Sequence, residues 1–341
     1  MQNKDALDNV TLYSLNQPIA KFRENAVGVL SPGQGSQYPG MGEELYESSD
    51  EAKSVFYEAS EATGVDIAEV CFGSQSHRLE ETLVAQPAIA AVSIAEYYRL
   101  KKLGLRTDVG LGHSMGEVPL LAMAGALSIK DTFGLLQKRA SSTAKASEAR
   151  PGIMAAVTGL TVEEAKQRLG HILEGGRAAM ANMNGVRQQV FSGDYDLIEE
   201  LESLIGHIRA TERIKVGFRK LKTGGAFHSR YHMEDAVQEF YDAATALKFK
   251  NPEFEIMLNN AQYLQETGIS NLPSYLSQQL ISGVDFTGGV DRLVNDGVTN
   301  FIEAGPGGGS NPKLKILSSL IKRDFEDRVQ IIEISEAGQS A

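Results

Sequence analysis

The pentapeptide Gly112-His113-Ser114-Met115-Gly116 constrains the fold more than any other part of this sequence. It follows an apolar run that is typical of a buried strand and precedes MGEVPLLAMAGALS, which is typical of a helix. A serine between glycines at such a junction lies on a tight turn that presents its hydroxyl at the end of a sheet. Composition alone gives roughly 0.3 accidental matches to the pattern GxSxG in a chain of this length. The interpretation therefore depends on the strand before the pentapeptide and the helix after it. The pattern predicts a nucleophilic serine in an α/β fold.

Composition narrows the class of protein. The chain has 341 residues, a formal net charge of −11 and one cysteine, Cys71. The charge disfavours nucleic acid as a partner, and a lone cysteine excludes a disulfide framework or a CxxC site. We find no apolar run of the ~20 residues that a membrane helix needs and no apolar signal core, so we expect no membrane partner and a cytoplasmic location. The 34 glycines indicate either many loops or close backbone approaches.

The order of strand and helix patterns divides the chain. Alternating strands and helices around the pentapeptide predict a parallel, helix-covered sheet. Residues 151–221 instead show the strand–helix–strand–strand–helix–strand order of a ferredoxin-like unit, in which Thr161 and Glu164 have capping-box spacing. We therefore predict an α/β protein with a large α/β-hydrolase-like catalytic domain and an inserted ferredoxin-like subdomain. The large domain would comprise residues 25–150 and 222–325, with a polar extension at 1–24 and a C-terminal tail at 326–341.

A nucleophilic serine needs a base, which is usually histidine. Among six histidines, His228 is the best candidate, because it lies in the small-residue loop GAFHS at the junction of the two predicted domains. His113 lies inside the pentapeptide and is expected to point away from the serine. A purely structural role for His228 has the same local pattern and remains an alternative.

Two further segments have a chemical interpretation and a plainer alternative. The loop Gly33-Gln34-Gly35-Ser36-Gln37 lacks the GK[ST] of a phosphate loop, but it can bring a hydrogen-bond donor beside a nucleophile on a neighbouring strand. Arg139 lies on the helix after the pentapeptide helix, where a buried guanidinium would need an anion such as a substrate carboxylate. A glycine turn and a solvated or salt-bridged arginine are the alternatives.

Taken together and in this order, these segments resemble the acyltransferase family of fatty-acid and polyketide synthesis. The motifs that carry the resemblance are PGQGSQ, QPAIAA from Gln86, GHSMGE, Arg139 at 25 residues after Ser114, GAFHS and EAGPGG. The resemblance covers roughly residues 26–325, and a ferredoxin-like second subdomain is also typical of the family.

The resemblance implies a role for each matching residue. Ser114 would accept the acyl group, and His228 would serve as general base and later as acid. Gln34 and the backbone N–H of Met115 would form the oxyanion hole, and Arg139 would bind the free carboxylate of a malonyl group. The acyl pocket would be lined by Gln86, Asn182 and Phe227. A main-chain carbonyl from the segment SGVDF, which contains Asp285, would orient the histidine.

The resemblance also implies the reaction and its partners. A malonyl group would pass from malonyl-CoA to the phosphopantetheine thiol of an acyl carrier protein through an acyl-serine intermediate. No resident cofactor or metal is expected, because the acyl-CoA thioester is itself the substrate. Carrier proteins are normally acidic, so docking would need a local basic patch. Such a patch, or merely a solvated surface cluster, is expected at Arg219, Lys220, Lys222 and Arg230.

Departures from the family pattern leave the acyl group open. Phe227 fits a malonyl pattern, whereas Gly225 stands where that pattern often has His and Thr143 where it often has Met. A substituted or unusual acyl unit is therefore an alternative, as is an acyl hydrolase acting on carrier proteins. A plain α/β-hydrolase would need an HGGG-type loop that we do not find. A non-catalytic docking subunit is disfavoured by the presence of both Ser114 and His228. The sequence does not decide between fatty-acid and polyketide synthesis.

Overall fold

The computed structural model describes residues 22–307 and 315–333. Within them, one parallel sheet has the strand order β7-β2-β1-β8-β9 and one antiparallel sheet has the order β4-β5-β3-β6. The predicted α/β class is confirmed. The parallel strands are β1 (Ala26–Ser31), β2 (Val109–Gly112), β7 (Glu255–Met257), β8 (Val298–Glu303) and β9 (Gln330–Ile331). The antiparallel strands are β3 (Ile153–Thr158), β4 (Ala178–Gly185), β5 (Gln188–Gly193) and β6 (Gly217–Lys220).

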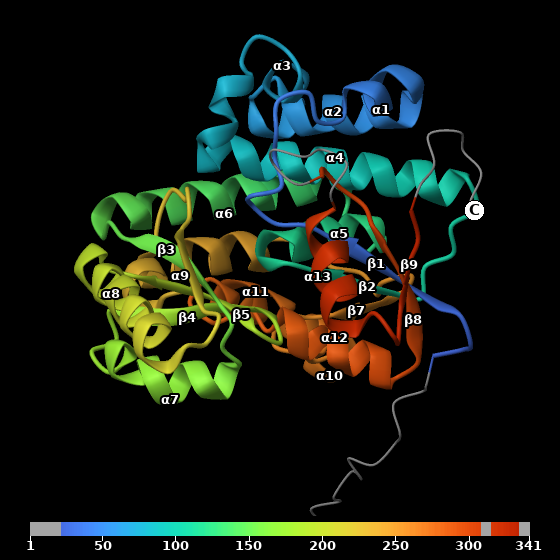
Figure 1. Cartoon of the computed structure of the whole chain (residues 1–341). Helices are drawn as coiled ribbons and strands as arrows, with labels where there is room; N and C mark the ends of the chain where they lie inside the picture. Colours follow the sequence, from blue (N-terminus) through green and yellow to red (C-terminus); the bar gives the residue numbers. More distant parts are fainter. Residues whose placement is uncertain (1–21, 308–314, 334–341) are drawn as a thin grey trace, which may run out of the picture.

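Helices cover both sheets, as Figure 1 shows. α7 and α8 lie on the outer side of the antiparallel sheet, and α4 and α6 pack side by side below α1, α2 and α3, which are at the top of the view. The longer helices are α2 (Asp50–Thr63), α4 (Thr82–Lys102), α5 (Glu117–Met123), α6 (Ile129–Ala149), α7 (Val162–Leu173), α8 (Tyr195–Glu212) and α9 (Arg230–Thr245). Those that follow are α11 (Leu272–Gln279), α12 (Phe286–Asn295) and α13 (Ile316–Phe325); the short ones are α1 (Glu43–Ser48), α3 (Ile67–Cys71) and α10 (Leu264–Thr267).

The register of the parallel sheet brings two loops together. β1 pairs with both β2 and β8, and its last residue, Ser31, lies opposite Gly112. The loop after β1 and the turn after β2 therefore leave the same edge of the sheet side by side. Gly33 lies so close to the turn that a Cβ there would be 2.7 Å from the carbonyl oxygen of His113.

The antiparallel sheet belongs to an inserted unit, which we call the small unit (residues 153–220); the rest is the large unit. Along each strand of the small unit, side chains point alternately to the two faces of the sheet, and both faces are apolar. One face packs under α7 and α8, and the other, with Met154, Ala156, Ala181 and Val190, contacts Phe227 of the large unit. The strand order is that of a ferredoxin-like unit, and the Thr161–Glu164 capping box is confirmed.

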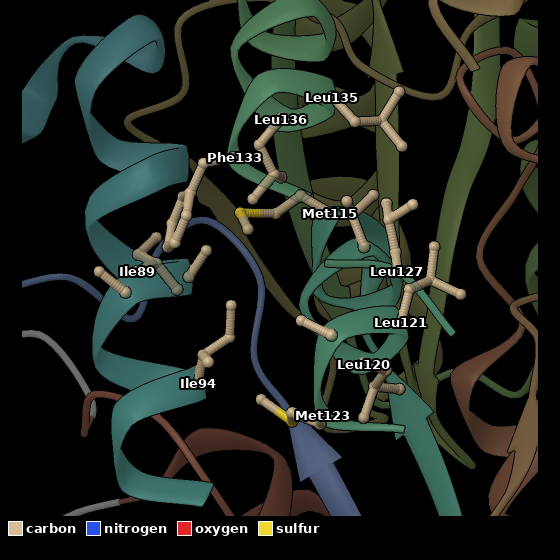
Figure 2. Close-up of a cluster of buried hydrophobic side chains, with 14 of the residues drawn as sticks. Ile89, Ile94, Met115, Leu120, Leu121, Met123, Leu127, Phe133, Leu135 and Leu136 are labelled. Atoms are coloured by element: carbon tan, nitrogen blue, oxygen red, sulfur yellow. The ribbon is translucent and has the colours of Figure 1, made fainter. Parts of the chain in front are cut away.

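Figure 2 shows the apolar cluster that supports the turn after β2. The side chain of Met115 lies among Phe133 and Leu136 of α6 and is 1% exposed. A buried Met in close packing fixes the residue that follows Ser114. The turn is therefore anchored from below by the core.

The C-terminal part of the chain departs from the sequence expectation. The predicted C-terminal tail contributes β9, which pairs in parallel with β8. The predicted N-terminal extension lies almost wholly outside the described residues, as does Gly308 of the EAGPGG motif. α4 begins at Thr82 and accommodates Pro87 inside the helix.

Candidate active site

Ser114 and His228 meet at the carboxyl edge of the parallel sheet. The Oγ atom of Ser114 lies 2.7 Å from Nε2 of His228, although the two residues are 114 positions apart. Ser114 begins the turn between β2 and α5, and His228 precedes α9. This distance is that of a nucleophile paired with its base.

Both residues have a left-handed backbone, with φ of 53° at Ser114 and 59° at His228. Such values are uncommon for residues other than glycine and persist where the surroundings hold them. Around Ser114 the packing leaves no room for side chains. A Cβ on Gly112 would lie 2.4 Å from the nitrogen of Glu117, and one on Gly116 would lie 2.2 Å from the carbonyl oxygen of Ser31.

The imidazole of His228 is oriented by main-chain carbonyls. Nδ1 lies 3.0 Å from the carbonyl oxygens of both Gln279 and Ser282, so Nδ1–H donates and Nε2 is left to accept from Ser114. Ser282 is the first residue of SGVDF, the segment from which the family resemblance implies an orienting carbonyl. Gln279 precedes this segment. Burial and then the nearby Arg139 cation lower the pKa of His228 to about 3. The ring is therefore neutral at neutral pH and can act as a base.

Arg139 reaches the nucleophile from α6. Its Nη2 donates to Oγ of Ser114 and to Oε1 of Gln279, both at 3.2 Å, and its Nη1 donates to Oε1 of Gln86 at 3.1 Å. The side chain is 5% exposed, and burial lowers the pKa of the guanidinium to about 10, so it stays charged at neutral pH. All three hydrogen-bond acceptors are neutral groups. The solvated or salt-bridged arginine considered from sequence is therefore not what the structure shows.

A buried polar network beneath Ser114 was missed from the sequence. Oδ1 of Asn259 accepts from the backbone N–H of Ser114 at 2.8 Å, and Nε2 of Gln279 donates to the Ser114 carbonyl at 2.8 Å. Glu117 holds this network together by accepting from Gln279 and from Tyr275, each at 2.7 Å. Burial raises the pKa of the Glu117 carboxyl to about 7, against these hydrogen bonds and the charge of Arg139.

Gln34 and Gln86 continue the polar chain away from Arg139. Nε2 of Gln86 lies 3.5 Å from Oε1 of Gln34, and Nε2 of Gln34 donates to Thr82 at 3.2 Å. Both amides therefore lie within one hydrogen-bonded row that ends at Ser114. The oxyanion hole expected from Gln34 and the Met115 N–H stays a prediction, because the amide nitrogen of Gln34 is engaged with Thr82.

The remaining predicted pocket residues lie where the two units meet. Phe227 packs against apolar clusters of both units. Asn182 is 5% exposed, and its strand runs beside Val284, with a 2.8 Å hydrogen bond from the N–H of Met183 to the Val284 carbonyl. Its role in an acyl pocket stays a prediction. Nε2 of His113 lies 2.7 Å from Oδ1 of Asn184.

The two departures from the family pattern have local structural causes. A Cβ on Gly225 would lie 2.0 Å from Oγ of Ser147, so α6 fills the space that a side chain there would need. Thr143 is 1% exposed, and its hydroxyl donates to the carbonyl of Arg139 at 2.8 Å. Thr143 therefore uses its polar group inside its own helix.

The basic residues near the His228 loop are exposed but not all free of carboxylates. Lys220 lies 3.2 Å from Glu202, and Arg230 lies 3.8 Å from Glu234. Within residues 22–307 and 315–333, no group of three or more His, Cys, Asp or Glu side chains could hold a metal ion. No helix in these ranges is long and apolar enough to cross a membrane.

A serine on a strand–helix turn, paired with a buried histidine and with a charged guanidinium at its hydroxyl, is the site of a serine acyl-transfer enzyme. The sequence comparisons give its family. The acyl transferase domain family matches residues 30–307, and the chain belongs to this family.

Similar proteins share this fold along most of their length. The malonyl CoA-acyl carrier protein transacylase of Bacillus subtilis strain 168 is 34% identical over 312 residues, which is 91% of this chain and 93% of the relative. The crystal structure of the malonyl CoA-acyl carrier protein transacylase from Clostridium perfringens superposes with a TM-score of 0.80 at 29% identity, covering 91% and 93% of the two chains. The acyltransferase domain of the second module of the salinomycin polyketide synthase gives 0.77 at 28% identity, covering 91% and 69%.

Proposed function

We propose that this chain transfers a malonyl group from malonyl-CoA to the phosphopantetheine thiol of an acyl carrier protein. The observation that carries the proposal is the position of Arg139. A buried cation that donates to the nucleophilic hydroxyl, and whose hydrogen-bond acceptors are all neutral, is complementary to a substrate carboxylate. An acyl hydrolase acting on uncarboxylated chains has no use for such a cation. The names of the similar proteins support the same substrates.

The geometry gives the order of proton movements. Nε2 of His228 accepts the Ser114 proton as Oγ attacks the thioester carbonyl, and the protonated ring then gives that proton to the departing CoA sulfur. The acyl group remains as a serine ester. In the second half, the ring accepts the proton of the phosphopantetheine thiol, whose sulfur attacks the ester, and then returns a proton to Oγ. The two halves balance without a cofactor.

Substrate binding also changes the base. The charge of Arg139 is one cause of the low pKa of His228. A malonyl carboxylate paired with the guanidinium would offset that charge, so the pKa of His228 would rise when a carboxylated substrate occupies the site. A carboxylated substrate therefore increases the basicity of the group that removes the serine proton.

Incubation with a panel of acyl-CoAs, followed by intact-mass measurement, tests the proposal. We expect a malonyl adduct on the wild-type chain that is absent from Ser114→Ala, and its discharge on addition of an acyl carrier protein. Methylmalonyl-CoA in the panel reports on a substituted acyl unit. An acetyl adduct formed in preference to malonyl would contradict the role given to Arg139.

We propose a cytoplasmic location, which the single buried thiol of Cys71 supports.

A further inference from the structure

A second buried histidine, His232, connects the two units of the molecule. It lies in the first turn of α9 and is 0% exposed. Its Nδ1 lies 2.9 Å from Oγ of Ser229, and its Nε2 lies 2.9 Å from Oδ1 of Asp194. Ser229 directly follows His228, whereas Asp194 belongs to the small unit, between β5 and α8. Two hydrogen bonds therefore lead from the neighbour of the proposed base to the small unit.

The chemistry of the three groups fixes the direction of both bonds. A carboxylate only accepts, so Nε2–H of His232 donates to Asp194, and the other ring nitrogen accepts from the hydroxyl of Ser229. Burial lowers the pKa of His232, against the opposing effect of Asp194, and the neutral ring satisfies both partners.

Ser229 and Asp194 bond to His232 and do not cap the helices that follow them. Ser229 and Asp194 occupy the N-cap positions of α9 and α8. Serine and aspartate are favoured there because their oxygens accept from the first N–H groups of the helix. Neither side chain caps its helix here, and each bonds to His232 instead. The link therefore replaces local helix capping at both of its ends.

The packing around the link is tight. A Cβ on Gly152, which leads from α6 into β3, would lie 2.8 Å from Nε2 of His232 and 2.7 Å from the Cβ of Ala226. From the small unit, Nη1 of Arg177 lies 2.9 Å from Oδ2 of Asp194. Both oxygens of the Asp194 carboxylate therefore have a partner. Because Gly152 has no side chain, the backbone that connects α6 to β3 lies directly against the imidazole of His232.

This arrangement bears directly on His228. Its φ of 59° needs support from the surrounding structure, and Ser229 is the next residue along the chain. Ser229 is held by its backbone, whose carbonyl accepts from the N–H of Met233 at 2.9 Å, and by its hydroxyl through His232. We infer that Ser229, His232 and Asp194 form a positioning relay that fixes the backbone of His228 relative to the small unit. The inference rests on the proposed role of His228 as the base.

The rate at which a fluorophosphonate probe labels Ser114 tests the relay, because this reaction needs the Ser–His pair and no particular acyl group. We expect Asp194→Ala and Ser229→Ala to be labelled about tenfold more slowly, as for a misplaced catalytic group. Asp194→Asn keeps an acceptor for His232 and should stay within about twofold of the wild-type rate. Thermal unfolding of each variant reports on the loss of stability.

Thr161→Ala is the matched control, because it removes a helix cap in the same unit without touching the relay. It should lower the unfolding temperature and leave the labelling rate unchanged. Wild-type labelling of Asp194→Ala, equal slowing in Thr161→Ala, or equal slowing in both Asp194 variants would overturn the relay. Labelling that is no faster in wild type than in His228→Ala would also overturn it. Normal labelling with no malonyl transfer would count against the proposed function alone.

Discussion

The guanidinium of Arg139 donates a hydrogen bond to the hydroxyl of Ser114 at 3.2 Å, across 25 positions of sequence. A full positive charge thus lies within contact of the nucleophile. Attack by Ser114 requires its proton to move to His228, and the cation opposes a positive charge on that ring. Substrate preference and basicity are therefore coupled through one side chain.

The first prediction concerns substrate preference. Arg139→Gln removes the charge but keeps a donor near Ser114. A hydrogen bond to a charged group contributes about 1.5–3 kcal/mol, so malonyl-CoA turnover should fall about 10–100-fold. The rate with acetyl-CoA should be retained or rise. Comparison of kcat/KM for the two thioesters measures the change, with Arg106→Gln as the control, because the side chain of Arg106 is 71% exposed. An equal loss with both substrates would contradict carboxylate recognition.

The second prediction concerns pH. The first half-reaction needs neutral His228, whose pKa is lowered to about 3 by burial and by Arg139. CoA release from malonyl-CoA should therefore keep its plateau in kcat/KM below the ordinary histidine range, to about pH 5. In Arg139→Gln the second cause of the low pKa is gone, so the acid limb with acetyl-CoA should move to higher pH. An acid limb centred near 6.5 in the wild type would contradict the buried, neutral ring.

The third prediction concerns the turn that carries Ser114. Gly112→Ala forces a Cβ to 2.4 Å from backbone atoms that cannot move aside. Destabilisation of more than about 2 kcal/mol is expected from overpacking and strain. Gly134→Ala, inside α6 with nothing within 4 Å of the new Cβ, is the control. It should stabilise the chain by about 0.5–1 kcal/mol. Chemical denaturation measures both, and equal effects would show that the close contact is relieved.

The fourth prediction concerns Asn259, which binds the N–H of Ser114 from 145 positions away. Asn259→Ala leaves this N–H and the carbonyl of Gly112 without their side-chain partner, at a cost of about 1–3 kcal/mol per unsatisfied group. Acylation by malonyl-CoA should also slow, because the turn loses a contact to its backbone. Unfolding and single-turnover acylation measure the two effects. An unchanged rate of acylation would show that Asn259 contributes only to the stability of the fold.

The fifth prediction concerns the carrier protein. Reversing the charge at Lys222 and Arg230 should raise the apparent KM for an acyl carrier protein and leave the KM for malonyl-CoA unchanged, because rim charges mainly affect encounter. Lys166→Glu, an exposed cation on α7, is the control. No change in KM for the carrier protein at low salt would reject the basic patch.

Patterns that are local in sequence could be predicted and long-range partners could not. The alternation of strands and helices, the ferredoxin-like insert and the Thr161 capping box depend on periodicity and on spacings of three or four residues. The glycines on either side of Ser114 indicate a tight turn from the local sequence alone. Asn259 and Glu117 belong to the same site, yet a lone asparagine or a glutamate in an apolar helix has no pattern that indicates its partner.

His228 shows the limit for the site itself. The loop GAFHS and its place between two units indicated a base, and the resemblance placed an orienting carbonyl within SGVDF. The second carbonyl, from Gln279, arises because α11 ends beside the ring, and the end of a helix is among the least predictable features of a sequence. The relay through His232 was missed because a histidine at the start of a helix has no distinctive local pattern.

The position of β8 beside β1 has a consequence for synthesis on the ribosome. β1 is made among the first residues of the described chain, but its neighbour β8 comes last but one among the strands of the parallel sheet. Gln279 and Ser282, which orient His228, are also late. A nascent chain that already exposes Ser114 therefore has an incomplete sheet and an unsupported base, and such long-range closure is slow. The Ser–His pair therefore gains its orienting carbonyls only after residue 282 has been made.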